Sequence, residues 1–306
     1  MSDFSKDFEA IDDEDEEDGE GFSPFDESVW ALAHGRGIIL GPDAITMGIL
    51  NVTPDSFSDG GRHEAVDMAV AHAEAMIEAG ADIIDIGGES TRPDATPVDA
   101  DTEQSRIKPV IEELSGRESM LLSVDTYRAS TAEMAVSSGV HIINDVGGCQ
   151  IDSDIARVAA DTGAGLVVMH SSRDREVNPD PIEDQIEFFQ KSLDICHDAG
   201  VEAEQIVLDP GFGFGKDGPG NIVLLQVLPV LHGLGFPLLI GTSRKRFLKS
   251  ITGKEAAGLG AATAATSVIA RMQGGAVFRV HDVAENVDAL AVADAVIAAP
   301  RSGLDS

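Results

Sequence analysis

Eight short apolar runs recur along the chain, and segments with helical periodicity separate them. The runs are rich in β-branched and aliphatic residues and are shorter than ordinary helices, so they predict strands. Strands that are apolar along their whole length are typical of a parallel sheet covered on both faces. The predicted strands lie at 45–52, 82–87, 121–124, 140–143, 165–169, 206–208, 237–240 and 277–280.

The intervening segments predict helices, several of which end near a glycine, the residue preferred just beyond a helix C-terminus. An open doubly wound sheet would show the same alternation, but eight strands, none followed by a GxGxxG sequence, favour a closed barrel. We therefore predict an α/β fold, a (β/α)8 TIM barrel over 30–306. The helices are expected at 64–79, 99–114, 128–138, 152–161, 181–199, 221–232, 255–273 and 283–299.

The N-terminal part of the chain has a different pattern. Residues 11–25 combine many acids with Gly, Ser and Pro and cannot bury a core, so we expect 1–29 to be a disordered acidic tail. The apolar runs 37–40 and 45–50 flank the turn-forming sequence GPDA, which predicts a short hairpin leading into the first barrel strand. Such a hairpin is placed to plug the floor of the barrel.

The charge balance narrows the classes of partner. The formal net charge is −33, of which −12 falls on residues 1–29 and −21 on the rest. The body shows no basic face that would neutralise phosphates, which argues against nucleic-acid binding. Its acidity, with seven lysines against fourteen arginines in the chain, is typical of salt-loving microbes, in which molar salt screens repulsion among surface acids. We therefore expect a halophilic origin.

Hydropathy argues against a membrane protein. No run of ~20 apolar residues occurs, and the N-terminal sequence MSDFSKDFEA lacks the basic and apolar parts of a signal peptide. We expect a cytoplasmic protein that does not contact membranes. Cys149 and Cys196 are too few for a disulfide framework or a zinc cluster, so we expect two buried thiols.

Each predicted strand ends in polar residues or glycine, at the end where barrel enzymes place their chemistry. One Asp after a strand is more often a helix N-cap than a catalytic group, but capping explains eight converging polar ends poorly. The rim formed by these ends is therefore the predicted active site. In chain order the ends carry Asn51, residues 88–92, Asp125, Asn144 with Asp145, His170, Asp209, residues 243–245, and Arg279 with His281.

Cationic side chains gather at the ends of the seventh and eighth strands. Barrels often bind phosphate at this position, and cationic donors there can neutralise phosphoryl oxygens. An anionic ligand is therefore indicated by Arg244, Lys245, Arg279 and His281. Asn51, after the first strand, adds a neutral oxygen that can serve Mg²⁺ when phosphate oxygens and waters complete its octahedron.

Oxygen acceptors and an amide follow the third, fourth and sixth strands, as Asp125, Asn144 and Asp209. These groups suit the edge of an amino-substituted heterocycle, and anchoring of solvated loops is the alternative. Two loops complete the rim. Residues 52–61 have the composition of a mobile lid, while the alternating glycines of 209–216 let backbone approach a ligand closely.

Eight segments of the chain resemble the motifs of the dihydropteroate synthases, a family of pterin-binding barrels. They cover the whole predicted barrel in the family's order, and several are too long to match by chance. The segments are MGILNVTPDSFSDGG (47–61), DIIDIGGESTRP (82–93), SVDTYR (123–128), INDVGG (143–148), VMH (168–170), LDPGFGFGK (208–216), GTSRKRFL (241–248) and RVHD (279–282).

The resemblance implies an alkyl-group transferase of folate biosynthesis. Its reaction condenses 7,8-dihydropterin-6-ylmethyl diphosphate with 4-aminobenzoate to give 7,8-dihydropteroate and pyrophosphate. Mg²⁺ is the implied cofactor, and the implied assembly is a homodimer that binds only small-molecule substrates. The implied pterin-binding residues are Asp125, Asn144, Met169, Asp209 and Lys245.

The same resemblance implies the remaining roles at the site. Asn51 is the implied ligand of Mg²⁺ on the diphosphate, and Asp55 lies with Phe57 in the loop that closes the site. The implied diphosphate-binding residues are Arg92, Arg279 and His281. The implied 4-aminobenzoate pocket consists of Thr91, Pro93, Phe214, Ser243 and Lys245. The implied catalytic residues are Asp55, Lys245 and Arg279.

One loop departs from the family's pattern. After VMH the family usually continues with a Met-x-Gly-x-Pro pattern, whereas this chain has SSRDREVNPDP at 171–181. The family resemblance therefore implies no contacts for the residues of this loop.

Two other activities fit the same barrel. They are a methyltetrahydrofolate-dependent corrinoid methyltransferase and a noncatalytic pterin-binding paralog. Neither needs a diphosphate site, so the presence of that apparatus favours the synthase. The residues concerned are Asn51, Arg92, Lys245, Arg279 and His281.

Overall fold

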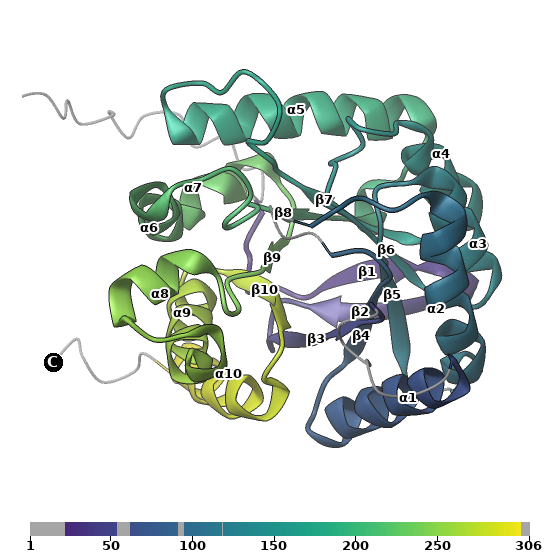
Figure 1. Ribbon diagram of the computed structural model, residues 1–306. Helices are drawn as coiled ribbons and strands as arrows, with labels where there is room; N and C mark the ends of the chain where they lie inside the picture. The colour runs from purple at the N-terminus through teal and green to yellow at the C-terminus, as the bar shows by residue number, and fades with distance from the viewer. Residues whose placement is uncertain (1–21, 54–61, 91–94, 118, 301–306) are drawn as a thin grey trace, which may run out of the picture.

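Eight parallel strands close into one barrel in the structure, a computed structural model that describes residues 22–53, 62–90, 95–117 and 119–300 (Figure 1). Each strand pairs with its neighbour in the chain, and β10 closes the barrel against β3. The predicted (β/α)8 barrel is therefore confirmed. The strands are β3 (Ile45–Asn51), β4 (Ile83–Gly87), β5 (Leu121–Asp125), β6 (Ile142–Asp145), β7 (Gly165–Met169), β8 (Ile206–Asp209), β9 (Leu238–Ile240) and β10 (Gly275–Val280).

Helices surround the barrel, as Figure 1 shows. They are α1 (Arg62–Glu78), α2 (Ala100–Leu114), α3 (Ala129–Ser137), α4 (Asp154–Thr162), α5 (Pro181–Ala199), α6 (Gly218–Gln226), α7 (Leu228–Leu231), α8 (Arg246–Thr252), α9 (Gly260–Met272) and α10 (Val283–Ile297). Short 3-10 turns are η1 (Ala33–Gly35), η3 (Ala203–Gln205), η4 (His232–Leu234) and η5 (Ala256–Gly258). Among the described residues, no helix is both long and apolar enough to cross a membrane.

Two predicted helices were wrong in extent, and one helix was not predicted. The segment 221–232 splits into α6 and α7, because Pro229 in the first turn of α7 has no N–H to continue the preceding helix. The segment 255–273 becomes helical only at Gly260, after the turn η5. Helix α8 follows directly from the polar end of β9 and is too short to show a clear period.

The N-terminal hairpin is present, but its strands differ from the prediction. β1 (Ser28–Leu32) pairs antiparallel with β2 (Arg36–Leu40), whereas 45–50, the expected partner of the second run, belongs to β3. The pattern of β1 is weak because it starts in the segment assigned to the acidic tail and buries only Trp30 and Leu32. Residues 1–21 of that predicted tail lie outside the described residues.

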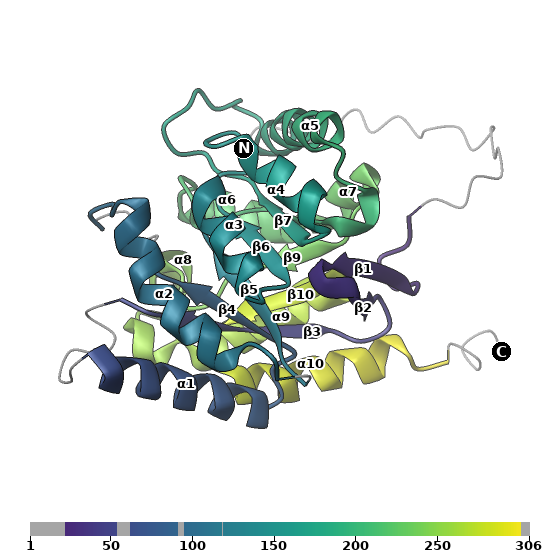
Figure 2. The same ribbon diagram turned by 90° about the vertical axis from the view of Figure 1, so that its right-hand side faces the viewer.

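The hairpin closes one end of the barrel, opposite the loops that follow the strands (Figure 2). The Trp30 side chain is 1% exposed, and its Nε1 donates to the Gln205 carbonyl at 2.8 Å. A Cβ atom on Gly165 would lie 2.6 Å from Leu32 Cδ2, so only glycine lets the strand approach this closely. The hairpin packs on the barrel residues Ile45, Met47, Ile83, Leu121, Ile142, Val167, Val207, Leu239, Ala276 and Val277.

Successive side chains of β4 alternate between the inside and the outside of the barrel. This alternation places the polar Asp85 in the interior, above the apolar floor. Ile84 and Ile86 belong to the core cluster between strands and helices, while Ile83 belongs to the cluster at the barrel floor. Because successive residues of a strand face opposite sides, Asp85 points to the same side as Ile83, one layer higher. In register, Asp85 pairs with Ser123 of β5, and both side chains are fully buried. The barrel is therefore apolar near the hairpin and polar toward the carboxyl ends of its strands.

Candidate functional site

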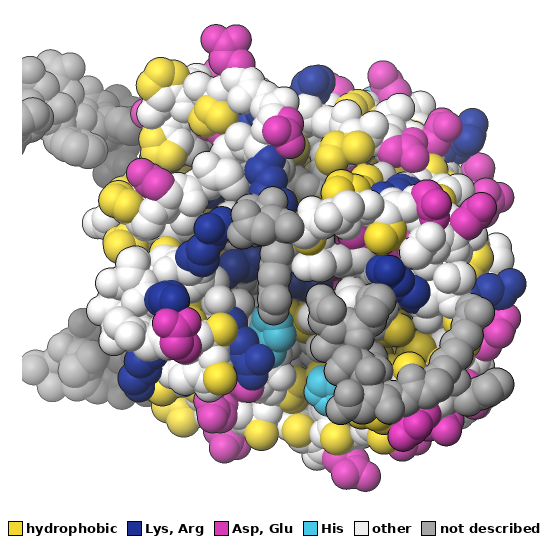
Figure 3. All heavy atoms as spheres, in the orientation of Figure 1, with side chains coloured by type: hydrophobic (Ala, Val, Ile, Leu, Met, Phe, Trp, Pro, Cys, Tyr) yellow, Lys and Arg dark blue, Asp and Glu magenta, His cyan; other side chains and the backbone are white. Residues whose placement is uncertain are grey.

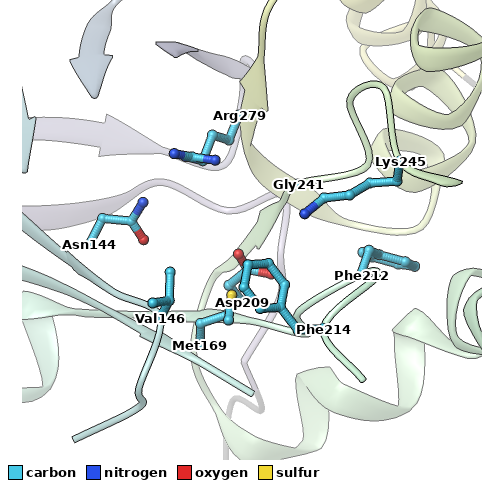
Figure 4. A pocket seen from close by; sticks show the side chains of 9 residues that line it. All are labelled: Asn144, Val146, Met169, Asp209, Phe212, Phe214, Gly241, Lys245 and Arg279. Carbon is cyan, nitrogen blue, oxygen red and sulfur yellow. The ribbon is translucent and has the colours of Figure 1, made fainter. Parts of the chain in front are cut away.

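A pocket opens at the carboxyl ends of the strands, where the sequence predicted the site (Figure 4). Lys245 and Arg279 reach into it from the side of β9 and β10, facing Asn144 and Met169 near the ends of β6 and β7. In the space-filling view of this face, Lys and Arg side chains gather around the mouth between α6 and α8 (Figure 3). The lining consists of Asn144, Val146, Met169, Asp209, Phe212, Phe214, Gly241, Lys245 and Arg279.

Arg279 is held between two buried carboxylates. Its Nε donates to Asp85 Oδ2 at 2.6 Å, and a terminal nitrogen donates to Asp125 Oδ2 at 2.6 Å. Asn144 Nδ2 also donates to Asp85 Oδ2, at 3.1 Å. The structure therefore brings together three predicted site residues, Asp125, Asn144 and Arg279. Asp85, which was not predicted, accepts hydrogen bonds from both Asn144 and Arg279.

Asp85 escaped the sequence analysis because it lies within a strand, and only strand ends were considered. A signal was available, however, since the run IIDIG is otherwise apolar. A carboxylate inside a buried strand is costly unless it is paired and hydrogen-bonded. An acid in such a run therefore indicates a cation facing it from elsewhere in the barrel.

Protonation of this cluster follows from burial and from its charges. Burial raises the pKa of Asp125 to about 7, with Asp85 adding to the shift and Arg279 opposing it. Burial disfavours the charged form of Arg279, but the Asp85 and Asp125 carboxylates outweigh it and raise the guanidinium pKa. Near neutral pH Asp125 can therefore donate as well as accept a hydrogen bond.

Lys245 and Asp209 are the other oppositely charged groups that line the pocket. Desolvation lowers the pKa of Lys245 to about 8, while the Asp209 carboxylate works in the opposite direction. Burial raises the pKa of Asp209, although Gly211 N donates to its Oδ1 at 2.7 Å. The Lys245 ammonium also lies 4.4 Å from the centroid of the Phe214 ring. Lys245 therefore lies against the aromatic wall of the pocket and within the electrostatic influence of Asp209.

His281 and Ser243 hold each other beside Arg279. Ser243 Oγ and His281 Nδ1 are 2.9 Å apart, and His281 N donates to the same oxygen at 3.1 Å. Burial, with the positive charges of Arg244 and Arg279, lowers the pKa of His281 to about 3. The imidazole is therefore neutral at physiological pH and offers a ligand a hydrogen bond without a charge.

Three residues of the predicted rim serve the protein itself. Arg244 pairs with Asp282, its Nε lying 3.1 Å from Oδ2. Asp145 accepts from the backbone of the loop that follows it, at 2.6 Å from Cys149 N. His170, fully buried, lies 2.9 Å from Asp184 Oδ2. Asp145 therefore anchors the loop that follows β6.

Asn51 ends β3 next to Gly87 of β4, its register partner. A Cβ built on Gly87 would lie 3.8 Å from Asn51 Oδ1 and 3.5 Å from Asp125 Cβ, so Asn51 borders the charged cluster. Within the described residues, no group of three or more His, Cys, Asp or Glu side chains could hold a metal ion.

The remaining predicted residues are distributed as follows. Cys149 and Cys196 are both buried, as predicted, with their sulfur atoms 3.9 Å apart. Met169 and Phe214 line the pocket. The predicted residues Asp55, Phe57, Thr91, Arg92 and Pro93 lie outside the described residues.

Comparisons with known proteins agree with this geometry. Residues 47–281 match the model of the pterin binding enzyme family. The chain is 43% identical to the dihydropteroate synthase of Bacillus subtilis over 253 residues, which cover 83% of this chain and 88% of that protein. It is 44% identical to a probable bifunctional folylpolyglutamate synthase/dihydropteroate synthase of Halobacterium salinarum, over 87% of this chain and 32% of that protein.

A solved structure is similar over its whole length. It is the dihydropteroate synthase of Xanthomonas albilineans with 4-aminobenzoic acid, which superposes with a TM-score of 0.83 at 41% identity. The match covers 89% of this chain and 100% of that one. The pocket therefore lies in a fold that this chain shares with dihydropteroate synthases.

Asp85→Ala is expected to lower the free energy of unfolding by about 3 kcal/mol, because it removes one partner of a buried ion pair. The matched control is Glu74→Ala, which breaks the exposed pair with Arg117 and is expected to cost less than about 1 kcal/mol. Urea denaturation of the two variants measures both values. Equal losses would show that Arg279 does not depend on Asp85.

Proposed function

Because this chain belongs to the family of pterin-binding enzymes and is a dihydropteroate synthase, we propose how the rim residues divide its substrates between them. The enzyme transfers an alkyl group in folate biosynthesis. It joins the methylene carbon of 7,8-dihydropterin-6-ylmethyl diphosphate to the amino group of 4-aminobenzoate, and releases pyrophosphate. Its substrates are small molecules.

The pterin is assigned to the pocket floor. The observation that carries this assignment is that the buried Asn144 and Asp209 line the pocket with the half-buried Lys245, while the buried Asp125 accepts from the lining residue Arg279. A pterin edge presents both donors and acceptors, which carboxyl, amide and ammonium groups can match. Met169, 2% exposed and part of the pocket lining, supplies an apolar surface for the ring.

The diphosphate is assigned to the ends of β3, β4 and β10. Arg279 offers a charge, the neutral His281 offers a hydrogen bond, and Arg92 is included on the resemblance alone. The 4-aminobenzoate is assigned to Phe214, Ser243 and Lys245, beyond the pterin. Thr91 and Pro93 are also assigned to that pocket, and like Arg92 they are included on the family resemblance alone.

Charge neutralisation at the leaving group explains the reaction. The carbon–oxygen bond to the diphosphate breaks, and Arg279 stabilises the charge that develops on the departing oxygens. The methylene carbon becomes cationic and is stabilised by the electron-rich dihydropterin, with Asp55 assigned beside it. The arylamine nitrogen then forms the new bond to this carbon and releases its proton to water. No protein nucleophile is required. The described residues that line the pocket include no serine or cysteine that could act as one.

The residues present fit a magnesium ion that arrives with the diphosphate. Asn51 supplies one neutral oxygen, and Mg²⁺ is often held by one or two protein oxygens together with substrate phosphates and waters. When bound, the ion would neutralise charge on the leaving group. The protein contributes the position of that ion through Asn51 at the end of β3.

Lys245→Ala and Asp209→Ala are each expected to lower dihydropteroate formation by at least ~100-fold, since each removes a preorganised polar group from the pocket. The assay follows dihydropteroate and pyrophosphate from the two purified substrates. Lys249→Ala, which changes an exposed lysine on α8, is the control and should keep full activity. Full activity in either pocket variant would contradict the assigned site.

Removal of Mg²⁺ by EDTA is expected to abolish turnover, and added Mg²⁺ should restore it. Asn51→Ala should raise the Mg²⁺ concentration needed for half-maximal rate, because the ion then loses its one assigned protein ligand. Titration of activity with Mg²⁺ measures the shift. An unchanged requirement in the variant would remove Asn51 from the metal site.

The acidic surface supports a halophilic origin, as does the similarity to a Halobacterium salinarum protein. We expect the melting temperature to rise from low to multimolar KCl, because the Debye length falls to ~3 Å and repulsion among the acids is screened. Differential scanning calorimetry across this range is the test. A melting temperature independent of KCl would contradict this origin.

A cytoplasmic location and a homodimer complete the proposed function. Exposed apolar side chains on two packed barrel helices, Ile269 and Met272 of α9 with Val292 and Val296 of α10, support a dimer. Sedimentation equilibrium gives the molecular mass, and a monomer at all concentrations would contradict the dimer.

A further inference from the structure

The loop between β7 and α5, at 170–180, packs against the pocket loop 209–216. Ser172 N donates to the Phe214 carbonyl at 3.1 Å. Gly215 has φ +77°, and a Cβ on it would lie 2.7 Å from the backbone carbon of Ser172. Two loops that touch backbone to backbone in this way have fixed relative positions. The β7–α5 loop is also the segment where the chain departs from the family's sequence pattern.

Buried charges hold this loop in place. Arg175 donates to Asp184 Oδ1 at 2.8 Å, and the Asp184 side chain is 4% exposed. Lys216 Nζ lies 2.8 Å from His170 Nδ1, while His170 Nε2 lies 2.9 Å from Asp184 Oδ2. Burial lowers the pKa of His170 to about 3, so the neutral ring can accept from Lys216 and donate to Asp184. The network ties the loop to α5 and to the pocket loop at once.

The anchored loop places Arg173 at the mouth of the pocket. The Arg173 guanidinium carbon lies 4.4 Å from the centroid of the Phe214 ring, and the Lys245 ammonium lies at the same distance from that centroid. Burial and the positive charge of Arg246 lower the pKa of Arg173, and Arg173 in turn lowers the pKa of Lys245. Two cations therefore lie over one pocket-lining ring, and Arg246 and the exposed Asp174 act on the first of them, Arg173.

We propose that Arg173 binds the carboxylate of the arylamine substrate and so selects a carboxylated ring. The proposal rests on the assignment of 4-aminobenzoate to Phe214. The carboxylate is para to the reacting amine, so when the amine faces the pterin the carboxylate points out toward the mouth. A guanidinium fork matches a carboxylate with two parallel hydrogen bonds, and its flat face stays on the Phe214 ring.

The test compares 4-aminobenzoate with its neutral isostere 4-aminobenzamide. Arg173→Ala is expected to raise the KM for 4-aminobenzoate at least about tenfold, because the carboxylate loses its charge-assisted hydrogen bonds to the guanidinium. The apparent affinity for the amide, as KM or as an inhibition constant, should stay unchanged, and so should the KM for the pterin diphosphate. Arg173→Lys should recover part of the loss, because it restores the charge without the fork. The matched control is Arg157→Ala, an exposed arginine on α4.

Other results have distinct meanings. An equal loss for acid and amide would show that Arg173 only supports the Phe214 ring, and would overturn the proposal. Unchanged affinity for both compounds would overturn it as well. If the unsubstituted protein forms no dihydropteroate, the proposed function fails instead, which the same assay shows before any variant is made.

Discussion

The ion pairs of Arg279 with Asp85 and Asp125 are the interactions on which the rest of the site depends. They lie directly above the apolar floor that the hairpin closes, where an unpaired charge would cost several kcal/mol. Because Asn144 also bonds Asp85, four strands fix one polar cluster. Groups held this way need little reorganisation when a charged substrate enters, which is the condition for strong electrostatic stabilisation.

The barrel could be predicted from the sequence because its strands are buried on both faces and read as apolar runs. The same logic failed for the hairpin, since β1 buries only alternate residues and begins among acids, so its partner β2 was paired with β3 instead. Helix lengths failed where local chemistry outweighs periodicity, as at Pro229. The periodicity of apolar residues alone does not show where a helix is interrupted.

The site could be predicted where the barrel fold itself brings side chains together. Strand ends converge by geometry, so Asn144, Asp209 and Arg279 were found, and all three line one pocket. Position at a strand end does not determine where a side chain turns, however, and His170 turns into a structural network with Asp184. Asp85 could have been found in another way. An acid inside an otherwise apolar strand indicates that a cation, here Arg279, faces it inside the barrel.

The acidic surface and the cationic mouth impose opposite conditions on anionic substrates. At low salt a chain of net charge −33 repels both substrates at long range. In concentrated salt that repulsion is screened within a few ångströms, and so is any attraction from exposed lysines and arginines. Recognition must then come from contacts that exclude water and ions, which are screened much less. Lys245, which lies over the Phe214 ring, and Arg279, which lies between two carboxylates, are cations placed to make such contacts. Cations placed inside the pocket therefore keep their effect on a bound anion at salt concentrations that screen the charges on the exterior.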